Sequence, residues 1–151
     1  MKTISFDLDD TLIPGTKVFE TEPQNWFQRL NKTEKIRLGT IQLFKQLRRR
    51  NFRIVIYTTS FRSVFSIRYT FLTYGIWLDE IINQSKHNNL LKERKYVCTK
   101  LPSAFGIDIH VDDSDGVKME GEKFNFKTII IAEKETNWAT KILNEISQAN
   151  P

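Results

Sequence analysis

Residues 4–12 read ISFDLDDTL, an apolar segment that ends in a group of carboxylates. We predict a β-strand over about Thr3–Leu8. Because strand side chains alternate between faces, Asp7 and Asp9 can point into one space where this strand ends. Two carboxylates in one space repel each other, so they require a cation or a shared proton. Phosphoryl transfer uses such a pair: one Asp attacks phosphorus, the other handles a proton, and Mg²⁺ screens the charge.

Strand-like and helix-like segments alternate along the rest of the chain, which is typical of a parallel α/β sheet. Further strands are expected at Arg53–Tyr57, Ile81–Ile82, Ile107–Val111 and Thr128–Ala132. Helices are expected at Glu34–Arg50 with Thr33 as N-cap, at Ser60–Tyr74, and at 136–149. Residues 83–100 are polar and basic and give no clear prediction.

The length of 151 residues predicts a single domain over 1–151, with a flap-like insertion at about 14–33 that is marked by Pro14, Gly15 and Pro23. One cysteine excludes an internal disulfide and fits a reducing compartment. No signal peptide and no membrane-spanning run is visible, so the chain is expected to be soluble and cytoplasmic. Residues 26–100 carry 16 basic and four acidic side chains, a balance that could attract a polyanion.

A second acidic pair follows the strand expected at Ile107–Val111, where residues 110–116 read HVDDSDG. Carboxyl ends of parallel strands meet at one edge of a sheet, so Asp112 and Asp113 should approach Asp7 there. Mg²⁺ needs oxygen ligands of this kind. Asp115 is interpreted as a turn residue before Gly116. His110 is interpreted as a hydrogen-bonded core residue.

The segment from Asp7 through Asp9 to Thr11 resembles the first motif of the haloacid dehalogenase (HAD) superfamily, Asp-x-Asp-x-Thr after a hydrophobic strand. Thr58, after the strand Arg53–Tyr57, is similar to the second motif, with Thr59 as the alternative. Lys100, in Lys100-Leu101-Pro102, resembles the third motif, with Lys95 as the alternative. The Asp112–Asp113 pair resembles the fourth motif. Together these motifs span most of the chain.

The resemblance implies a three-layer, Rossmann-like α/β fold with a parallel five-strand sheet in the order 5-4-1-2-3. It implies a Mg²⁺-dependent phosphomonoester hydrolase in which Asp7 forms an aspartyl-phosphate. Asp9 would act as acid and base, while Thr58 and Lys100 would stabilise the transferring group. The metal would bind Asp7, the backbone carbonyl of Asp9, and Asp113 directly, with Asp112 as a second ligand or as a partner of the ligands.

The substrate is expected to be a phosphorylated molecule. The chain has no room for more than a minimal cap domain, so the site should be open and suit a large or exposed phosphorylated substrate. Thr59 and Arg62 are candidates for binding it. The basic residues Lys45, Arg48, Arg49, Arg50 and Arg53 should lie at the opposite edge of the sheet, which weakens the case for nucleic acid. The alternatives are a non-catalytic HAD-scaffold binding or regulatory protein and a small-metabolite phosphatase or phosphotransferase.

Overall fold

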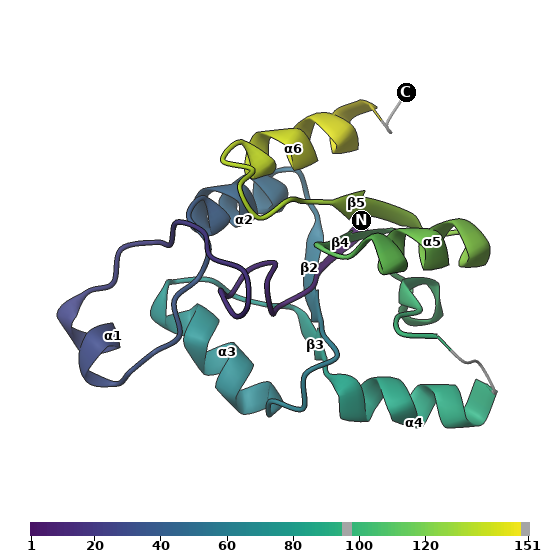
Figure 1. The fold of residues 1–151 in the computed structure, drawn as a ribbon, viewed down its shortest axis with the longest axis horizontal. Coiled ribbons are helices and arrows are strands. Elements are labelled where there is room, and N and C mark those ends of the chain that lie inside the picture. The colour runs from purple at the N-terminus through teal and green to yellow at the C-terminus, as the bar shows by residue number, and fades with distance from the viewer. Residues whose placement is uncertain (95–97, 149–151) are drawn as a thin grey trace.

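The computed structural model describes residues 1–94 and 98–148 and contains a sheet of five parallel strands (Figure 1). The spatial order β3-β2-β1-β4-β5 confirms the predicted order 5-4-1-2-3, with the strand that leads to Asp7 in the centre. The strands are β1 Thr3–Phe6, β2 Arg53–Tyr57, β3 Glu80–Ile82, β4 Ile109–Asp112 and β5 Lys127–Ile130.

The helices lie between the strands and after the last one. They are α1 Trp26–Leu30, α2 Thr40–Arg49, α3 Val64–Thr73, α4 Gln84–Arg94, α5 Asp115–Phe124 and α6 Trp138–Gln148, with a short 3₁₀ helix, η1, at Pro102–Phe105. None of the described helices is long and apolar enough to cross a membrane.

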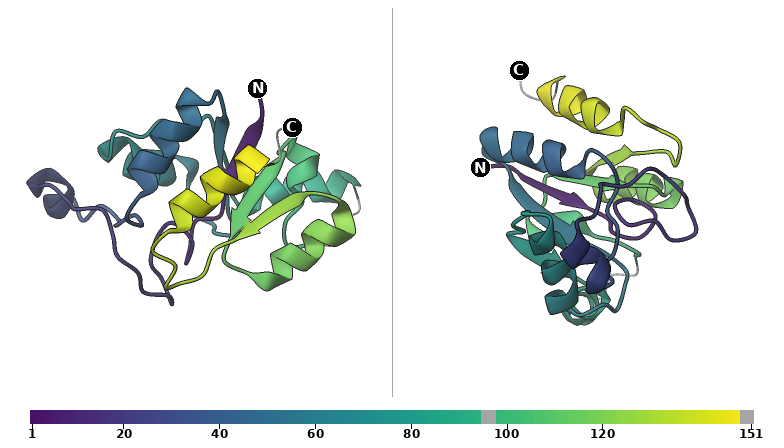
Figure 2. Two further views of the ribbon diagram at one scale, coloured as in Figure 1. Left: turned by 90° about the horizontal axis from the view of Figure 1, so that it is seen from above. Right: turned by 90° about the vertical axis from the view of Figure 1, so that its left-hand side faces the viewer.

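Helices cover both faces of the sheet, which gives the Rossmann-like three-layer arrangement (Figure 2). On one face, Phe6 and Ile56 belong to the main core, to which α2, α3 and α6 contribute Phe44, Phe71 and Trp138. The other face holds a smaller cluster around Val55 and Tyr57, with α4 on β3 and α5 on β5. Strands buried on both faces read as continuous apolar runs, which is why β2 was predicted with its correct bounds.

The predicted helix Glu34–Arg50 is wrong in its first part. Helix α2 begins only at Thr40, after Gly39 with a φ of 93°. The preceding residues run alongside the flap instead, since Glu22 N–H donates to Ile36 O and Leu38 N–H to Glu20 O. Pairing between distant segments therefore outweighs the local preference for a helix.

Helices α4 and α5 were not predicted. Helix α4 has no clear apolar stripe and buries His87, whose ring contacts the sheet through Tyr57. Helix α5 contains two glycines, which ordinarily count against a helix. Gly121 is required by close packing, because a Cβ there would lie 2.4 Å from the Thr128 hydroxyl of β5.

Strand β1 ends at Phe6, two residues earlier than predicted, although Asp7 N–H still donates to Val111 O of β4 at 2.8 Å. The chain then forms a tight turn in which the amides of Leu12 and Ile13 both bond Leu8 O. Strand alternation therefore does not govern the direction of Asp9, which lies within this turn.

The segment 14–33 leaves this turn and carries the short helix α1. Its start is fixed by Asp10, whose carboxylate accepts bonds from the amides of Gly15 and Lys17 and from the hydroxyl of Thr16. Asp10 has a φ of 62°, the left-handed region that Asp tolerates better than most residues. The beginning of the flap is therefore anchored close to the end of β1.

Candidate functional site

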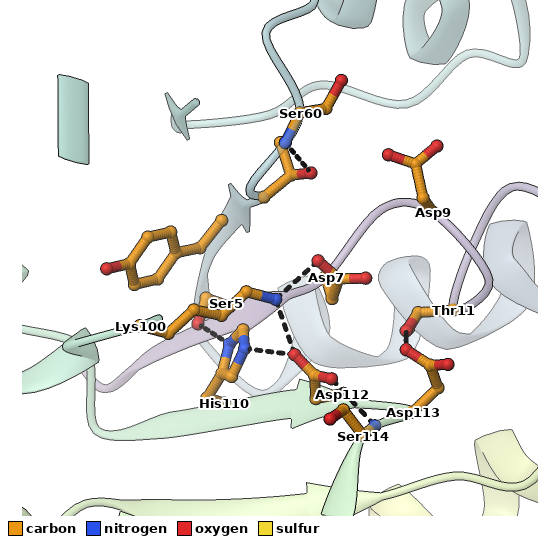
Figure 3. A network of polar contacts seen from close by, with 12 residues as sticks. Ser5, Asp7, Asp9, Thr11, Ser60, Lys100, His110, Asp112, Asp113 and Ser114 are labelled. Carbon is orange, nitrogen blue, oxygen red and sulfur yellow. Dashed lines mark hydrogen bonds and ion pairs between the residues drawn. The ribbon is translucent and has the colours of Figure 1, made fainter. Parts of the chain in front are cut away.

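Three carboxylates converge where β1 and β4 end (Figure 3). Asp7 follows the last residue of β1, Asp112 is the last residue of β4, and Asp113 is the next residue along the chain. Each offers one oxygen atom, and these atoms lie within 4.8 Å of one another. The structure thus brings Asp7 of the first acidic pair close to Asp112 and Asp113, which form the second pair, as the parallel topology predicted.

Lys100 lies between two of these carboxylates. Its Nζ is 2.5 Å from Asp7 Oδ1 and 2.6 Å from Asp112 Oδ2, and the residue is 2% exposed. A buried ammonium requires such partners, because burial without compensation is costly. Lys100 therefore lies directly beside Asp7, whereas the alternative candidate, Lys95, lies outside the described residues.

Burial sets the protonation of this cluster. It raises the pKa of Asp7 to about 6, because desolvation outweighs the attraction of Lys100 and the nearby charge of Asp112 adds to the increase. Burial alone would raise the pKa of Asp112 as well, but the hydrogen bond from His110 and the charge of Lys100 lower this pKa overall. Burial alone would lower the pKa of Lys100, yet the two carboxylates raise it. The cluster thus combines a firmly ionised Asp112 with an Asp7 whose charge needs further compensation.

His110 holds Asp112 from behind, as a core residue. The ring is fully buried, its Nε2 is 3.0 Å from Asp112 Oδ2, and its Nδ1 is 2.8 Å from Ser5 Oγ. Burial, reinforced by the charge of Lys100, lowers the pKa of His110 to about 4. The neutral ring therefore donates a hydrogen bond from Nε2–H to Asp112 and accepts one at Nδ1 from the Ser5 hydroxyl.

Asp113 lies nearer the surface and contacts the flap. Its Oδ1 accepts the Thr11 hydroxyl at 3.1 Å, and its Oδ2 is 2.5 Å from Lys17 Nζ. Lys17 also donates to the backbone carbonyl of Asp113. The turn after β1, through Thr11, and the flap, through Lys17, thus both reach the edge of the carboxylate cluster.

Asp9 does not join the cluster. Its Oδ1 is 2.5 Å from Arg62 Nη1, and Arg62 also contacts Glu34 Oε1 at 2.8 Å. The Asp9 side chain is 42% exposed, and Figure 3 shows its carboxylate turned away from Asp7. Asp9 and Arg62 thus form an ion pair beside the cluster rather than a second carboxylate within it.

Thr58 and Thr59 follow β2 at the same edge of the sheet. Thr58 is buried and its Oγ1 accepts the amide of Ser60 at 3.1 Å, so its hydroxyl organises the turn into α3. Its hydroxyl proton can still be donated elsewhere. Thr59 is exposed. Of the two, Thr58 has the more fixed hydroxyl.

Several supporting residues were missed by sequence reasoning. Glu120 of α5 accepts the amides of Thr99 and Lys100, at 2.7 and 3.1 Å. The Tyr57 hydroxyl accepts the amide of Leu101 at 2.8 Å and lies 2.5 Å from His87 Nδ1. These contacts fix the backbone on both sides of Lys100. Like the Lys17 contact with Asp113, they join residues far apart in the sequence and leave no local pattern.

Asp7, Asp112 and Asp113 form a donor set for a cation that prefers oxygen ligands. Three carboxylates face two ammonium groups, from Lys100 and Lys17, so the cluster retains negative charge. Ligand oxygens of one Mg²⁺ lie ~2.0–2.1 Å from the ion, hence at most about 4.2 Å apart, and the three carboxylate oxygens here lie within 4.8 Å of one another. Asp7, Asp112 and Asp113 are the side chains that would hold the ion.

Most of the helix-end basic residues lie away from this cluster. Arg48 and Arg49 end α2, and Arg53 begins β2, at the amino edge of the sheet. Arg48 and Arg53 are also engaged with Asp79 and Glu80. They lie at the opposite edge from Asp7, as expected.

No protein-family model matches the chain, and no curated protein sequence is significantly similar to it.

Proposed function

We propose that the chain is a Mg²⁺-dependent phosphomonoester hydrolase that acts through an aspartyl-phosphate on Asp7. The observation that carries the proposal is the meeting of Asp7, Asp112 and Asp113, the first two of which share buried Lys100. A carboxylate nucleophile, a cation that offsets its charge and a group of metal-binding oxygens are the parts that phosphoryl transfer through an acyl phosphate needs. The HAD resemblance assigns the same roles to these residues.

In the first step, an Asp7 carboxylate oxygen forms a bond to phosphorus while the bond to the leaving alkoxide oxygen breaks. Asp9 delivers a proton to that oxygen, so an alcohol departs. Asp9 must turn from its present position beside Arg62 to do so. In the second step, Asp9 takes a proton from water, which attacks phosphorus and releases inorganic phosphate, restoring Asp7.

Lys100 and Thr58 would stabilise the charge on the transferring group. Bound Mg²⁺ would supply charge neutralisation to the phosphoryl oxygens and to Asp7. His110 and Ser5 keep Asp112 ionised and fixed, and Glu120 with Tyr57 keeps the Lys100 backbone in place. The positioning residues thus lie on the face of the sheet that α4 and α5 cover.

The proposal is tested by a phosphatase screen with and without Mg²⁺ across an aryl phosphate, sugar phosphates, nucleotides, phosphopeptides and phosphorylated oligonucleotides. Phosphate release that requires Mg²⁺ and is stopped by EDTA is expected for at least one class. A pure, folded sample that binds Mg²⁺ and releases phosphate from none of them would favour a non-catalytic binding role.

Asp113→Asn should weaken Mg²⁺ binding and activity together, by at least about tenfold, because a ligand charge is lost while the shape is kept. Calorimetric titration of Mg²⁺ and phosphate release at limiting Mg²⁺ measure the two effects. Asp115→Asn is the matched control, since Asp115 is exposed in the first turn of α5. Unchanged Mg²⁺ affinity in Asp113→Asn would remove Asp113 from the ligand set.

A further inference from the structure

Helix α3 carries two apolar stripes, and only one of them is buried. The buried stripe contains Ile67 and Phe71 in the main core. The second stripe, Phe65, Tyr69 and Leu72, has the spacing i, i+4, i+7 of one helix face, and these residues are 78%, 38% and 45% exposed. A helix that is apolar on both sides is ordinarily covered on both sides. The exposed stripe is therefore a surface without a partner in the described part of the chain.

This surface extends beyond α3. Of the 13 large apolar residues that are exposed in the described part of the chain, eight lie within residues 26–30 and 61–72. Helix α1 adjoins the last turn of α3, where Gln28 Nε2 donates to Thr73 O at 3.1 Å. We define the α3 face by its exposed apolar residues, which are Phe61, Val64, Phe65, Tyr69 and Leu72, with Trp26, Phe27 and Leu30 of α1. Apolar surfaces concentrated in this way mark interaction sites.

One end of the α3 face lies next to the candidate site. Phe61 is 73% exposed and stands between Ser60, which bonds Thr58, and Arg62, which bonds Asp9. A molecule covering the α3 face would therefore reach the residues proposed to act on the substrate. Phe61 and Arg62, which are consecutive in the sequence, therefore connect the α3 face to the candidate site.

The charge on the α3 face is predominantly basic. Residues 24–32 and 61–74 contain four basic side chains, Arg29, Lys32, Arg62 and Arg68, and no acidic side chain. Arg62 is neutralised by Asp9 and Glu34, so the positive charge comes from the other three. An occupant with acidic side chains between apolar ones would complement this surface. The stripe from Phe65 to Leu72 spans about 10 Å along the helix, enough for several side chains of a polypeptide. Bases of a single-stranded nucleic acid could stack on the aromatic rings of the face. Leu30, Val64 and Leu72 offer no such stacking surface, so a polypeptide segment with apolar side chains fits the whole face better.

We propose that the α3 face docks a phosphoprotein substrate, through a segment that combines apolar and acidic side chains and leads its phosphorylated residue to Asp7. This inference rests on the proposed hydrolase function and adds the class of substrate. Apolar anchors on the substrate pack against Phe65, Tyr69 and Leu72, and the phosphorylated residue reaches the site past Phe61 and Arg62.

The test compares synthetic phosphoserine peptides in pairs. One member of each pair contains acidic residues together with Leu and Phe at positions i, i+4 and i+7. The other member has Ser in place of each Leu and Phe. The distance along the peptide from these positions to the phosphoserine varies between pairs. The wild type should hydrolyse the best apolar member with a kcat/KM at least about tenfold above its polar counterpart. Phe65→Ser with Leu72→Ser should abolish that difference and leave hydrolysis of a small aryl phosphate unchanged. The matched control is Leu38→Ser with Met119→Ser, two exposed apolar residues outside the α3 face, and it should behave as wild type.

Binding of the same peptides to Asp7→Asn, measured by fluorescence anisotropy, separates docking from catalysis. If no phosphate ester is hydrolysed, the proposed hydrolase function fails. Whether the α3 face docks a peptide is then decided by the anisotropy measurement alone, from tighter binding of the apolar peptide than of its polar counterpart. The docking proposal is overturned if wild type shows no preference within any pair, or if the Phe65/Leu72 variant keeps it. It is also overturned if a 5′-phosphorylated oligonucleotide is the preferred substrate. A wild-type dimer in sedimentation analysis that this variant converts to monomer would assign the face to a second copy and contradict the proposal.

Discussion

Asp7→Asn should abolish phosphatase turnover, with a loss on the order of 10⁴-fold or more, because an amide cannot attack phosphorus. The fold should remain, since the amide is close in size to the carboxylate and Lys100 keeps Asp112 as its partner. Steady-state phosphate release and circular dichroism on the same sample measure the two effects. Asp115→Asn serves as the control for changing an acidic residue to an amide.

Turnover near the wild-type rate by pure Asp7→Asn would exclude Asp7 as the nucleophile. That outcome would not support a non-catalytic scaffold role either, because the variant would still turn over the substrate. Loss of both turnover and the circular dichroism signal would instead assign a structural role to the Asp7 carboxylate.

Lys100→Met should lower the free energy of unfolding by about 3–5 kcal/mol, because it leaves two buried carboxylates without their shared cation. Activity should be lost at the same time. Urea unfolding at neutral pH without Mg²⁺ measures the change. Lys86→Met is the matched control: Lys86 contacts Glu80 at the surface with 47% of its side chain exposed, and exposed pairs contribute only about 0–1 kcal/mol.

A change below about 1 kcal/mol in Lys100→Met would mean that the carboxylates do not depend on this lysine. Added Mg²⁺ gives a second readout for the variant. Because a divalent cation would replace part of the lost positive charge, Mg²⁺ should restore more stability to Lys100→Met than to Lys86→Met.

The sheet could be predicted from sequence because its central strands are buried on both faces and read as apolar runs. Ile54 to Ile56 show this most clearly. Helices were less predictable where long-range contacts decide the structure. Residues 36–38 pair with the flap rather than extending α2, and α5 depends on the close approach of Gly121 to β5. Neither contact has a local signal.

The carboxylate cluster could be predicted because parallel strands bring their carboxyl ends together. That rule places Asp7 near Asp112 and Asp113 without any knowledge of side-chain contacts. The rule applies to the ends of strands and not to the turn that follows β1, so it could not predict that Asp9 pairs with Arg62. The contact of Lys17 with Asp113 comes from the path of the flap, which shows no clean periodicity in the sequence.

The most direct test of a nucleophilic Asp7 is to trap its phosphorylated form in Asp9→Asn. With an activated aryl phosphate, whose leaving group departs without a proton, the first step should survive better than the second, because no base remains for water. Mass spectrometry of peptides from the quenched reaction should then find a phosphoryl group on Asp7, labile to hydroxylamine as an acyl phosphate is. A phosphoryl group on another residue, or release of phosphate by Asp9→Asn at the wild-type rate with no label on Asp7, would contradict the mechanism.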